Sequence, residues 1–331
     1  MRAYALSPAA QSLLEGLRCW PAPEQATPIL SMQVHADREG MVQFSASELG
    51  VPALNWIVDV PSLEQQLAEA VRYQPAIDRV AEPVAAALTV VCEGRASSTR
   101  AELGVEFDTV RYPHHAVATR LHCERAHQQV ARQWFTAEGD IVAFLPLGGP
   151  AGQEVAVVWS QDADRAARVM DWDDAQLAEQ LRQISSGVLG DLQVQGARAR
   201  WPLLLAQARH WIGHMPGQTD QSFALAGDAA HAMHPLAGQG LNMGLGDVAE
   251  LARVLAARES WRPLSDLKLL RRYERARQGD WQRMRMATDS LQLLFHNPAP
   301  WAGLLRNWGM NLFDHSGPVK SRIARMAMGL A

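Results

Sequence analysis

Cysteine is scarce in this chain, and other marks of a specialised protein class are missing as well. Only 3 of the 331 residues are cysteines: Cys19, Cys92 and Cys123. Three widely spaced thiols form neither a disulfide framework nor a zinc site, so we expect reduced thiols. No apolar run reaches the roughly 18 residues of a membrane-spanning helix. Residues 1–18 lack the apolar core of a secretory signal, so we expect a cytoplasmic protein.

Neither sign of charge is in large excess. The 31 basic and 35 acidic residues give a formal charge of −4, which offers no argument for a nucleic-acid partner. Apolar residues make up 48% and charged residues 20%, so most of the chain is expected to fold. From Trp261 onward, 12 Lys/Arg stand against 5 Asp/Glu, a net charge of +7. This basic region fits either an anionic membrane surface or a solvated helix face that pairs with the acidic body.

The spacing of apolar residues predicts both helices and strands. Helices are expected at 8–18, 62–73 (with Ser62 as N-cap), 173–185, from Asp247 onward, at 264–294 and at 300–312. Strands are expected at 29–36, 41–46 and 54–60, the first two joined by a turn at 37–40. Four more, at 114–124, 129–136, 140–147 and 154–160, are joined by short turns, which indicates an antiparallel sheet. The apolar run 84–92 is typical of a strand buried on both faces of a parallel sheet.

One segment, residues 223–256, combines features of a ligand site. A short apolar strand at 223–226 precedes Gly227 and Asp228, and glycines at 238 and 240 precede a helix. A carboxylate just past a strand end is well placed to accept hydrogen bonds from a sugar or ribityl hydroxyl. Glycines that open a helix let backbone N–H groups approach a negatively charged ligand. The spacing differs from the GxGxxG dinucleotide motif, so it fits an anion or cofactor site and a tight packing turn equally well.

The amino-acid sequence of this segment is more informative than the spacing of its glycines. GDAAHAMHPLAGQGLNMGLGDVAEL (227–251) resembles the second FAD-binding motif of the class A flavoprotein monooxygenases, above all the UbiH/UbiF/VisC group of ubiquinone-biosynthesis hydroxylases. Three further stretches are similar to the same family: RAYALSPAAQSLLEGL (2–17), VVCEGRASSTRAELGV (90–105) and the C-terminal residues 271–295 with 306–312. The resemblance therefore runs along the whole chain.

The resemblance implies an α/β fold in which a Rossmann-like FAD layer is interleaved with a mixed or antiparallel sheet. The FAD layer would comprise residues 1–26, 61–104 and 206–260, without its first βαβ unit. The substrate sheet would comprise 27–60 and 105–205, and a helical C-terminal region would follow at 261–331.

The resemblance also implies a chemistry and a set of site residues. The protein would be a flavoprotein monooxygenase that uses FAD, O2 and NAD(P)H or another electron donor to hydroxylate an aromatic ring, a polyprenyl phenol of ubiquinone biosynthesis. The flavin would carry the chemistry, so no side chain is expected to be catalytic. Partners would include enzymes of the same pathway, and attachment would be peripheral to the inner membrane. The cofactor-binding residues implied are Arg2, Gly94, Gly227, Asp228, Pro235, Gly238, Gln239, Gly240 and Asn242.

The family's N-terminal strand–GxGxxG–helix–strand unit has no counterpart in this sequence, and Glu93 stands where the family usually has Asp. From this we expect the chain to be a shortened reading of a longer gene, by about 30–50 residues, the size of a βαβ unit. Two other functions stay open. One is a flavin-free accessory protein of the same fold, and the other is a hydroxylase of a soluble aromatic acid.

The remaining candidates have ordinary structural interpretations. His231 and His234 lack acidic or cysteine partners at metal-ligand spacing, so we set zinc aside. Trp56, Trp134 and Trp159 lie on expected strands, where core packing is favoured over a role in lining an aromatic pocket.

Overall fold

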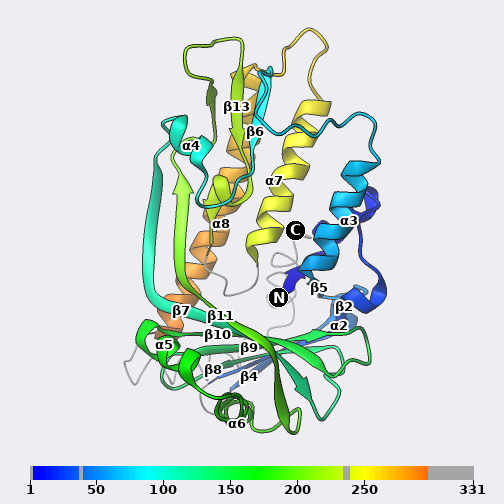
Figure 1. Cartoon of the computed structure of the whole chain (residues 1–331), viewed down its shortest axis with the longest axis vertical. Coiled ribbons are helices and arrows are strands. Elements are labelled where there is room, and N and C mark those ends of the chain that lie inside the picture. The colour runs from blue at the N-terminus through cyan, green and yellow to red at the C-terminus, as the bar shows by residue number, and fades with distance from the viewer. Residues whose placement is uncertain (1–2, 37–39, 234–238, 297–331) are drawn as a thin grey trace. The chain divides into compact units, whose positions relative to one another are not determined.

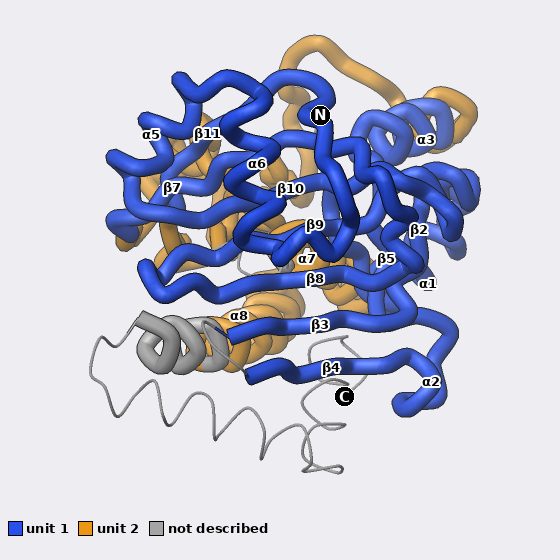
Figure 2. Tube along the Cα trace, turned by 90° about the horizontal axis from the view of Figure 1, so that it is seen from below, with its two compact units in different colours: residues 1–70, 112–203, 290–331 blue, residues 71–111, 204–289 orange. Residues whose placement is uncertain are grey.

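The structure is a computed structural model, and it describes residues 3–36, 40–233 and 239–296. The contacts group the chain into two compact units, coloured separately in Figure 2. Unit 1 comprises residues 1–70, 112–203 and 290–331, and unit 2 comprises 71–111 and 204–289. The three domains expected from the sequence stay a prediction.

An eight-stranded sheet has the order β14-β11-β7-β10-β9-β8-β3-β4. Its strands are β3 (Ser31–His35), β4 (Met41–Ser45), β7 (Phe107–Cys123), β8 (Val130–Phe135), β9 (Ile141–Leu147), β10 (Glu154–Asp162), β11 (Leu192–Ala208) and β14 (His231–Ala232). The β7/β10, β10/β9, β9/β8 and β3/β4 pairs are antiparallel, and β3/β8 is parallel. This confirms the antiparallel sheet and the pairing of the two strands around residues 37–40.

Two helices of unit 1, α5 (Ala163–Asp171) and α6 (Asp174–Ile184), provide the partner for one face of this sheet (Figure 1). Their buried side chains join those of β7 to β10 in one apolar cluster of unit 1. Trp134 and Trp159 are 8% and 5% exposed inside this cluster, which confirms the core-packing interpretation. The α6 helix begins at a capping box in which the Asp173 carboxylate accepts from the Gln176 amide at 2.7 Å.

A smaller antiparallel sheet in unit 1 has the order β1-β5-β2, from β1 (Ala3–Leu6), β5 (Asn55–Asp59) and β2 (Ala26–Ile29). Ile29 and Ile57 from it cluster with Ala156 of β10. The α1 helix (Pro8–Gly16) has Pro8 in its first turn, as expected, and Ser7 as N-cap. A short α2 helix (Ala46–Leu49) follows β4.

The α3 helix (Val60–Arg72) continues directly from β5, so the expectation of Ser62 as its N-cap is wrong. Pro61 explains the difference, because proline is tolerated in the first helical turn and therefore permits the helix to begin before the serine. Ser62 lies inside the helix.

Unit 2 contains a three-stranded sheet of order β12-β13-β6, formed by β12 (Ile212–His214), β13 (Ser222–Leu225) and β6 (Leu88–Val91). The helices α4 (Ser98–Glu102) and α7 (Gln239–Ala256) and most of α8 (Leu267–His296) belong to it. The β6/β13 pair is parallel, as expected for the run 84–92. The expected length and two-sided burial of that run are wrong, since only 88–91 form a strand and Val90 is 43% exposed.

The C-terminal helix expected at 264–294 is confirmed as α8. The helix expected at 300–312 lies outside the described residues, as do residues 37–39 of the expected turn. The helix expected from Asp247 onward begins earlier, at Gln239.

Candidate cofactor site

The loop after β13 carries the first part of the candidate site. Gly227 and Asp228 follow this buried strand after Ala226 and form a short 3-10 turn with Ala229. Gly227 has a φ of +59°, which is the left-handed conformation that glycine adopts without strain. Asp228 is exposed, while Ala226, Ala229 and Ala230 around it are buried. The loop thus presents one carboxylate on an otherwise closed surface.

The neighbouring parallel strand ends beside it. Leu225 of β13 is in register with Val91 of β6, so the carboxyl ends of both strands lie at one edge of the sheet. Gly94 follows β6 with a φ of +79°. In open α/β sheets, ligands bind in the crevice outside the carboxyl ends of parallel strands. This register therefore brings Gly94 and Gly227 to the position where a cofactor is expected.

Glu93 serves the loop before α4 rather than the crevice. Its carboxylate accepts hydrogen bonds from the Ser97 hydroxyl at 2.8 Å, the Thr99 hydroxyl at 2.5 Å and the Thr99 amide at 3.1 Å. These bonds, above all those from Thr99, lower the pKa of Glu93. The Ser97 hydroxyl in turn caps α4 by accepting from the Arg100 amide. The residue that departs from the family pattern is thus used to order its own loop.

The N-terminal part of α7 packs against the Gly227 turn. A Cβ atom added to Gly244 would stand 3.3 Å from the Cα of Gly227, so this close packing depends on a glycine in the helix. Gly240 lies in the first turn of α7 and has open space where a Cβ would stand. The same is true of Gly94 and Gly227. Three backbone segments can therefore be approached closely by a ligand.

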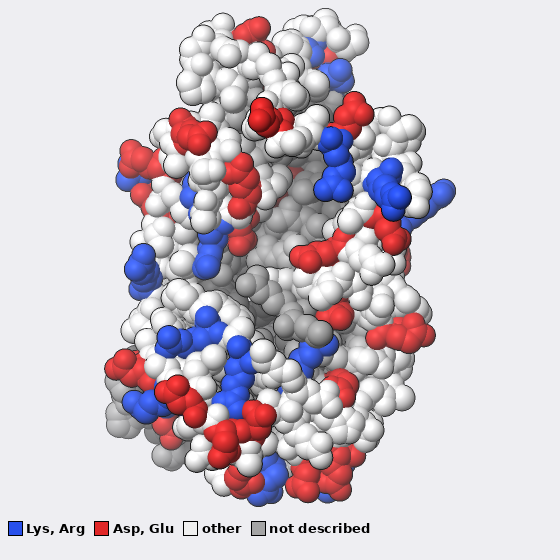
Figure 3. Space-filling model, viewed as in Figure 1, with Lys and Arg blue, Asp and Glu red and all other residues white. Residues whose placement is uncertain are grey.

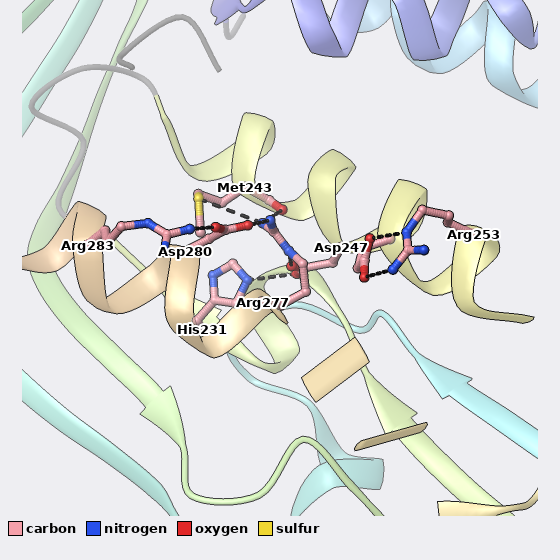
Figure 4. Close-up of polar contacts among 8 residues, drawn as sticks. His231, Met243, Asp247, Arg253, Arg277, Asp280 and Arg283 are labelled. Carbon is pink, nitrogen blue, oxygen red and sulfur yellow. Dashed lines mark hydrogen bonds and ion pairs between the residues drawn. The ribbon is translucent and has the colours of Figure 1, made fainter. Parts of the chain in front are cut away.

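A buried polar network connects the Gly227 turn and β14 to the helices α7 and α8, and Figure 4 shows its side chains. The Asp247 carboxylate of α7 accepts from the Gly227 amide at 2.8 Å, and its Oδ2 lies 2.7 Å from His231 Nε2. Its Oδ1 accepts from Arg277 Nε of α8 at 2.7 Å. Arg277 also donates to the Met243 carbonyl at 3.0 Å. Because Asp247 is 0% exposed, these partners compensate a charge that water cannot reach.

Further buried groups contact β13, the turn that follows it and His231 of β14. The Trp211 ring stacks on His231 with centroids 4.9 Å apart, and Tyr273 of α8 donates to the Leu225 carbonyl at 2.7 Å. Burial raises the pKa of the Tyr273 hydroxyl, so it stays a neutral donor. Arg100 donates to the Ala229 carbonyl at 3.0 Å. Each contact holds β13 or its following turn in place.

The structure brings six of the nine expected site residues into unit 2: Gly94, Gly227, Asp228, Gln239, Gly240 and Asn242. Arg2, Pro235 and Gly238 lie outside the described residues. The described residues offer an exposed carboxylate after a parallel strand, three glycines whose backbone is open, and the first turn of an 18-residue helix. These features suit a ligand that has hydroxyl groups and an anionic edge. The residues present therefore fit a flavin dinucleotide, although their contacts with it stay a prediction.

Sequence reasoning missed Asp247, Arg277 and Arg100, and it treated His231 only as a poor metal ligand. A signal for Asp247 exists in the pattern of α7. Met243, Asp247, Leu251 and Val254 are all buried and share one helix face. A carboxylate on the apolar face of a helix requires a buried cation, which Arg277 supplies.

Comparisons with known proteins agree with this geometry. Residues 33–288 match the family described as FAD binding domain. The chain is 33% identical over 249 residues to the ubiquinone hydroxylase UbiL of Rhodospirillum rubrum, covering 75% of this chain and 56% of that protein. It is 28% identical over 354 residues to the 3-demethoxyubiquinol 3-hydroxylase of Escherichia coli, covering 100% of this chain and 88% of that protein.

A solved structure is similar along nearly the whole chain. The p-nitrophenol 4-monooxygenase PnpA of Pseudomonas putida DLL-E4 has a TM-score of 0.70 at 16% identity, with 99% of this chain and 86% of that one covered. This likeness confirms the expected α/β fold, and the relatives confirm the resemblance to the UbiH/UbiF/VisC group. The chain spans little more than half the length of UbiL. With residues 33–288 matched, the chain belongs to the FAD binding domain family, and FAD is the cofactor of that family.

Proposed function

We propose that this protein is an FAD-dependent monooxygenase that hydroxylates an aromatic ring. The observation that carries the proposal is the meeting of Gly94 and the Gly227–Asp228 turn at the carboxyl ends of two parallel strands, with α7 packed on that turn. Two relatives are named as hydroxylases. Bound FAD supplies the reaction with O2 after it is reduced by NAD(P)H or another donor.

The chain's own residues would hold and orient that cofactor. Asp228 would accept hydrogen bonds from ribityl hydroxyls, and Gly227 gives the cofactor room beside it. The backbone N–H groups at Gly238, Gln239 and Gly240 would meet the pyrimidine edge, with Asn242 next to them. Because the N-terminus of α7 carries a partial positive charge, it favours an electron-rich ring there. Arg2, Gly94 and Pro235 complete the proposed set.

The proposed substrate is a polyprenyl phenol of ubiquinone biosynthesis. The relatives' names support it, since two of them act on ubiquinone or its precursors.

We further propose peripheral attachment to an anionic membrane surface and contact with enzymes of the same pathway. Among the described residues, none of the helices has the length and apolar character needed to cross a bilayer. On the face drawn in Figure 3, basic and acidic side chains are interspersed rather than gathered into one field. The net charge of +7 from Trp261 onward supports the attachment. Deleting residues 300–331 should weaken binding to anionic vesicles, and unchanged binding would assign these residues no part in it.

The absorbance spectrum of the purified protein tests the proposed activity most directly. Oxidised flavin should give its two visible bands, and NAD(P)H oxidation in the presence of a phenolic substrate should yield a product heavier by one oxygen atom. A colourless protein that also takes up no added FAD would overturn the proposal and favour the flavin-free accessory protein.

A further inference from the structure

A groove in unit 2 lies between α7 and α8, on the side of the buried network that faces solvent. It has a volume of about 440 Å³ and is formed by residues of these two helices alone. Its lining residues are Gly246, Ala249, Glu250, Arg253, Arg275, Ala276, Arg277, Gly279, Asp280 and Arg283. The cofactor site described above uses none of the exposed ones among them.

Arginine dominates the charge of this groove. Four guanidinium groups line it, from Arg253, Arg275, Arg277 and Arg283, against the carboxylates of Glu250 and Asp280. The Arg253 and Arg283 side chains are 66% and 70% exposed, so a ligand can reach them from solvent. The lining therefore carries an excess positive charge of two.

Both carboxylates are already engaged. Glu250 accepts two hydrogen bonds from Arg253, at 2.8 and 2.7 Å, and these bonds lower its pKa. Asp280 pairs with Arg277 and with Arg283 (Figure 4). In the part of the chain that the structure describes, Arg275 has no ion pair or hydrogen bond of its guanidinium. Donor capacity thus remains on the groove's rim after the carboxylates are satisfied.

The floor of the groove is made of small residues. Gly246, Ala249, Ala276 and Gly279 stand between the arginines. At Gly246 an added Cβ would come within 2.9 Å of the Arg277 guanidinium, so glycine there lets this side chain cross from α8 to α7. Small side chains at these positions leave room for a ligand beside the arginines. Arginine forks arranged around such a space match the oxygens of a phosphate group.

We propose that the α7–α8 groove binds a phosphate-type oxyanion through Arg253, Arg275 and Arg283. The same chemistry is offered by the headgroup of an anionic phospholipid and by a soluble phosphorylated compound. The inference is independent of the hydroxylase activity, because it rests only on the charge and shape of the groove.

The sharpest test alters the floor without removing an arginine. Ala276→Glu places a carboxylate among the guanidinium groups, and Ala276→Gln is its neutral match of equal size. Ala276 is exposed, so both variants should fold. Ala276→Glu should weaken anion binding about three- to tenfold, and Ala276→Gln should leave it close to wild type.

The rim is tested by Arg275→Gln and Arg283→Gln, with Arg258→Gln as the control. Arg258 is exposed in unit 2 but does not line the groove, so its variant makes the same change in net charge. Binding is measured in two arms. The first is calorimetry with inorganic pyrophosphate, and the second is co-sedimentation with vesicles of phosphatidylglycerol and phosphatidylcholine.

The two arms separate the sources of the phosphate. Loss of pyrophosphate binding in the groove variants indicates a soluble ligand, and loss confined to vesicle binding indicates a lipid headgroup. The proposal is overturned if wild type binds neither probe. It is equally overturned if Arg258→Gln and Ala276→Gln weaken binding as much as the groove variants do. Flavin content and activity are not read in this experiment, so its outcome is separate from that of the proposed function.

Discussion

His231 Nε2 lies 2.7 Å from Oδ2 of Asp247, and both side chains are buried. The same carboxylate accepts from the Gly227 amide and from Arg277. A single side chain thus ties the turn after β13, the strand β14 and the helix α8 to the helix α7. We infer that Asp247 is a positioning residue, because it fixes the backbone of Gly227 beside the proposed ribityl site.

Replacing Asp247 with alanine should destabilise the protein strongly. The change removes the buried carboxylate that the Arg277 guanidinium, His231 and the Gly227 amide share, which costs about 3–5 kcal/mol of the free energy of unfolding. Urea unfolding measures this difference. Asp280→Ala is the matched control, since Asp280 also pairs with Arg277 but is 37% exposed. It should cost at most about 1 kcal/mol. Equal losses in the two variants would contradict the central role of Asp247.

Replacing Asp228 with alanine should instead lower flavin retention. Asp228 is exposed, and loss of its hydrogen bonds to a ribityl chain should weaken FAD binding by about 1–3 kcal/mol. This corresponds to roughly five- to 150-fold. The ratio of flavin to protein absorbance after gel filtration measures the effect. Asp220→Ala, another exposed aspartate of unit 2, should retain wild-type flavin. Full flavin content in Asp228→Ala would remove Asp228 from the site.

Local pattern was sufficient for elements whose signals are local. The helix expected at 173–185 is α6, whose capping box is visible in the sequence. The prediction of a buried strand over 84–92 was wrong because an alanine-rich apolar stretch has no periodicity that distinguishes a strand from an exposed loop. The 17-residue strand β11 was not expected at all, since its burial does not alternate and its neighbours β14 and β7 are distant in sequence.

The site shows the same division between local and long-range information. Gly227 and Asp228 follow from a contiguous motif. Asp247 does not, because its partner Arg277 stands 30 positions away. The apolar residue Val248 next to it is 44% exposed, and the buried face of α7 runs through Asp247 instead. A shift of one position on a helix rotates a side chain by about 100°, which was enough to hide the buried carboxylate.

Two helical glycines should respond oppositely to alanine. Alanine normally stabilises a helix interior by about 0.5–1 kcal/mol relative to glycine. At Gly279 the added Cβ would meet only the flexible end of Arg283 at 3.9 Å, so Gly279→Ala should show this gain. At Gly244 it would press on the Gly227 backbone at 3.3 Å, so Gly244→Ala should fall short of it and lower flavin retention. Urea unfolding and flavin content measure the pair. An equal gain in both variants would show that α7 does not need this close approach.

Asp140 in unit 1 should make stability depend on pH. It is 3% exposed, pairs with Arg165 and accepts from Trp159 Nε1 at 3.2 Å. Burial outweighs these partners and raises the pKa of Asp140 to about 6 from 3.8. Between these two pH values the folded protein holds a proton that the unfolded chain releases.

A group whose folded pKa is raised contributes stability that is present at low pH and lost as pH rises. The free energy of unfolding of wild type, measured relative to Asp140→Asn, should therefore fall by about 1–3 kcal/mol between pH 4 and pH 6.5 and stay constant above pH 7. Urea unfolding of both proteins across this range checks it, with asparagine as the permanently neutral match. The opposite slope, a gain for wild type as pH rises, would show that the Arg165 ion pair outweighs burial and keeps the pKa of Asp140 low.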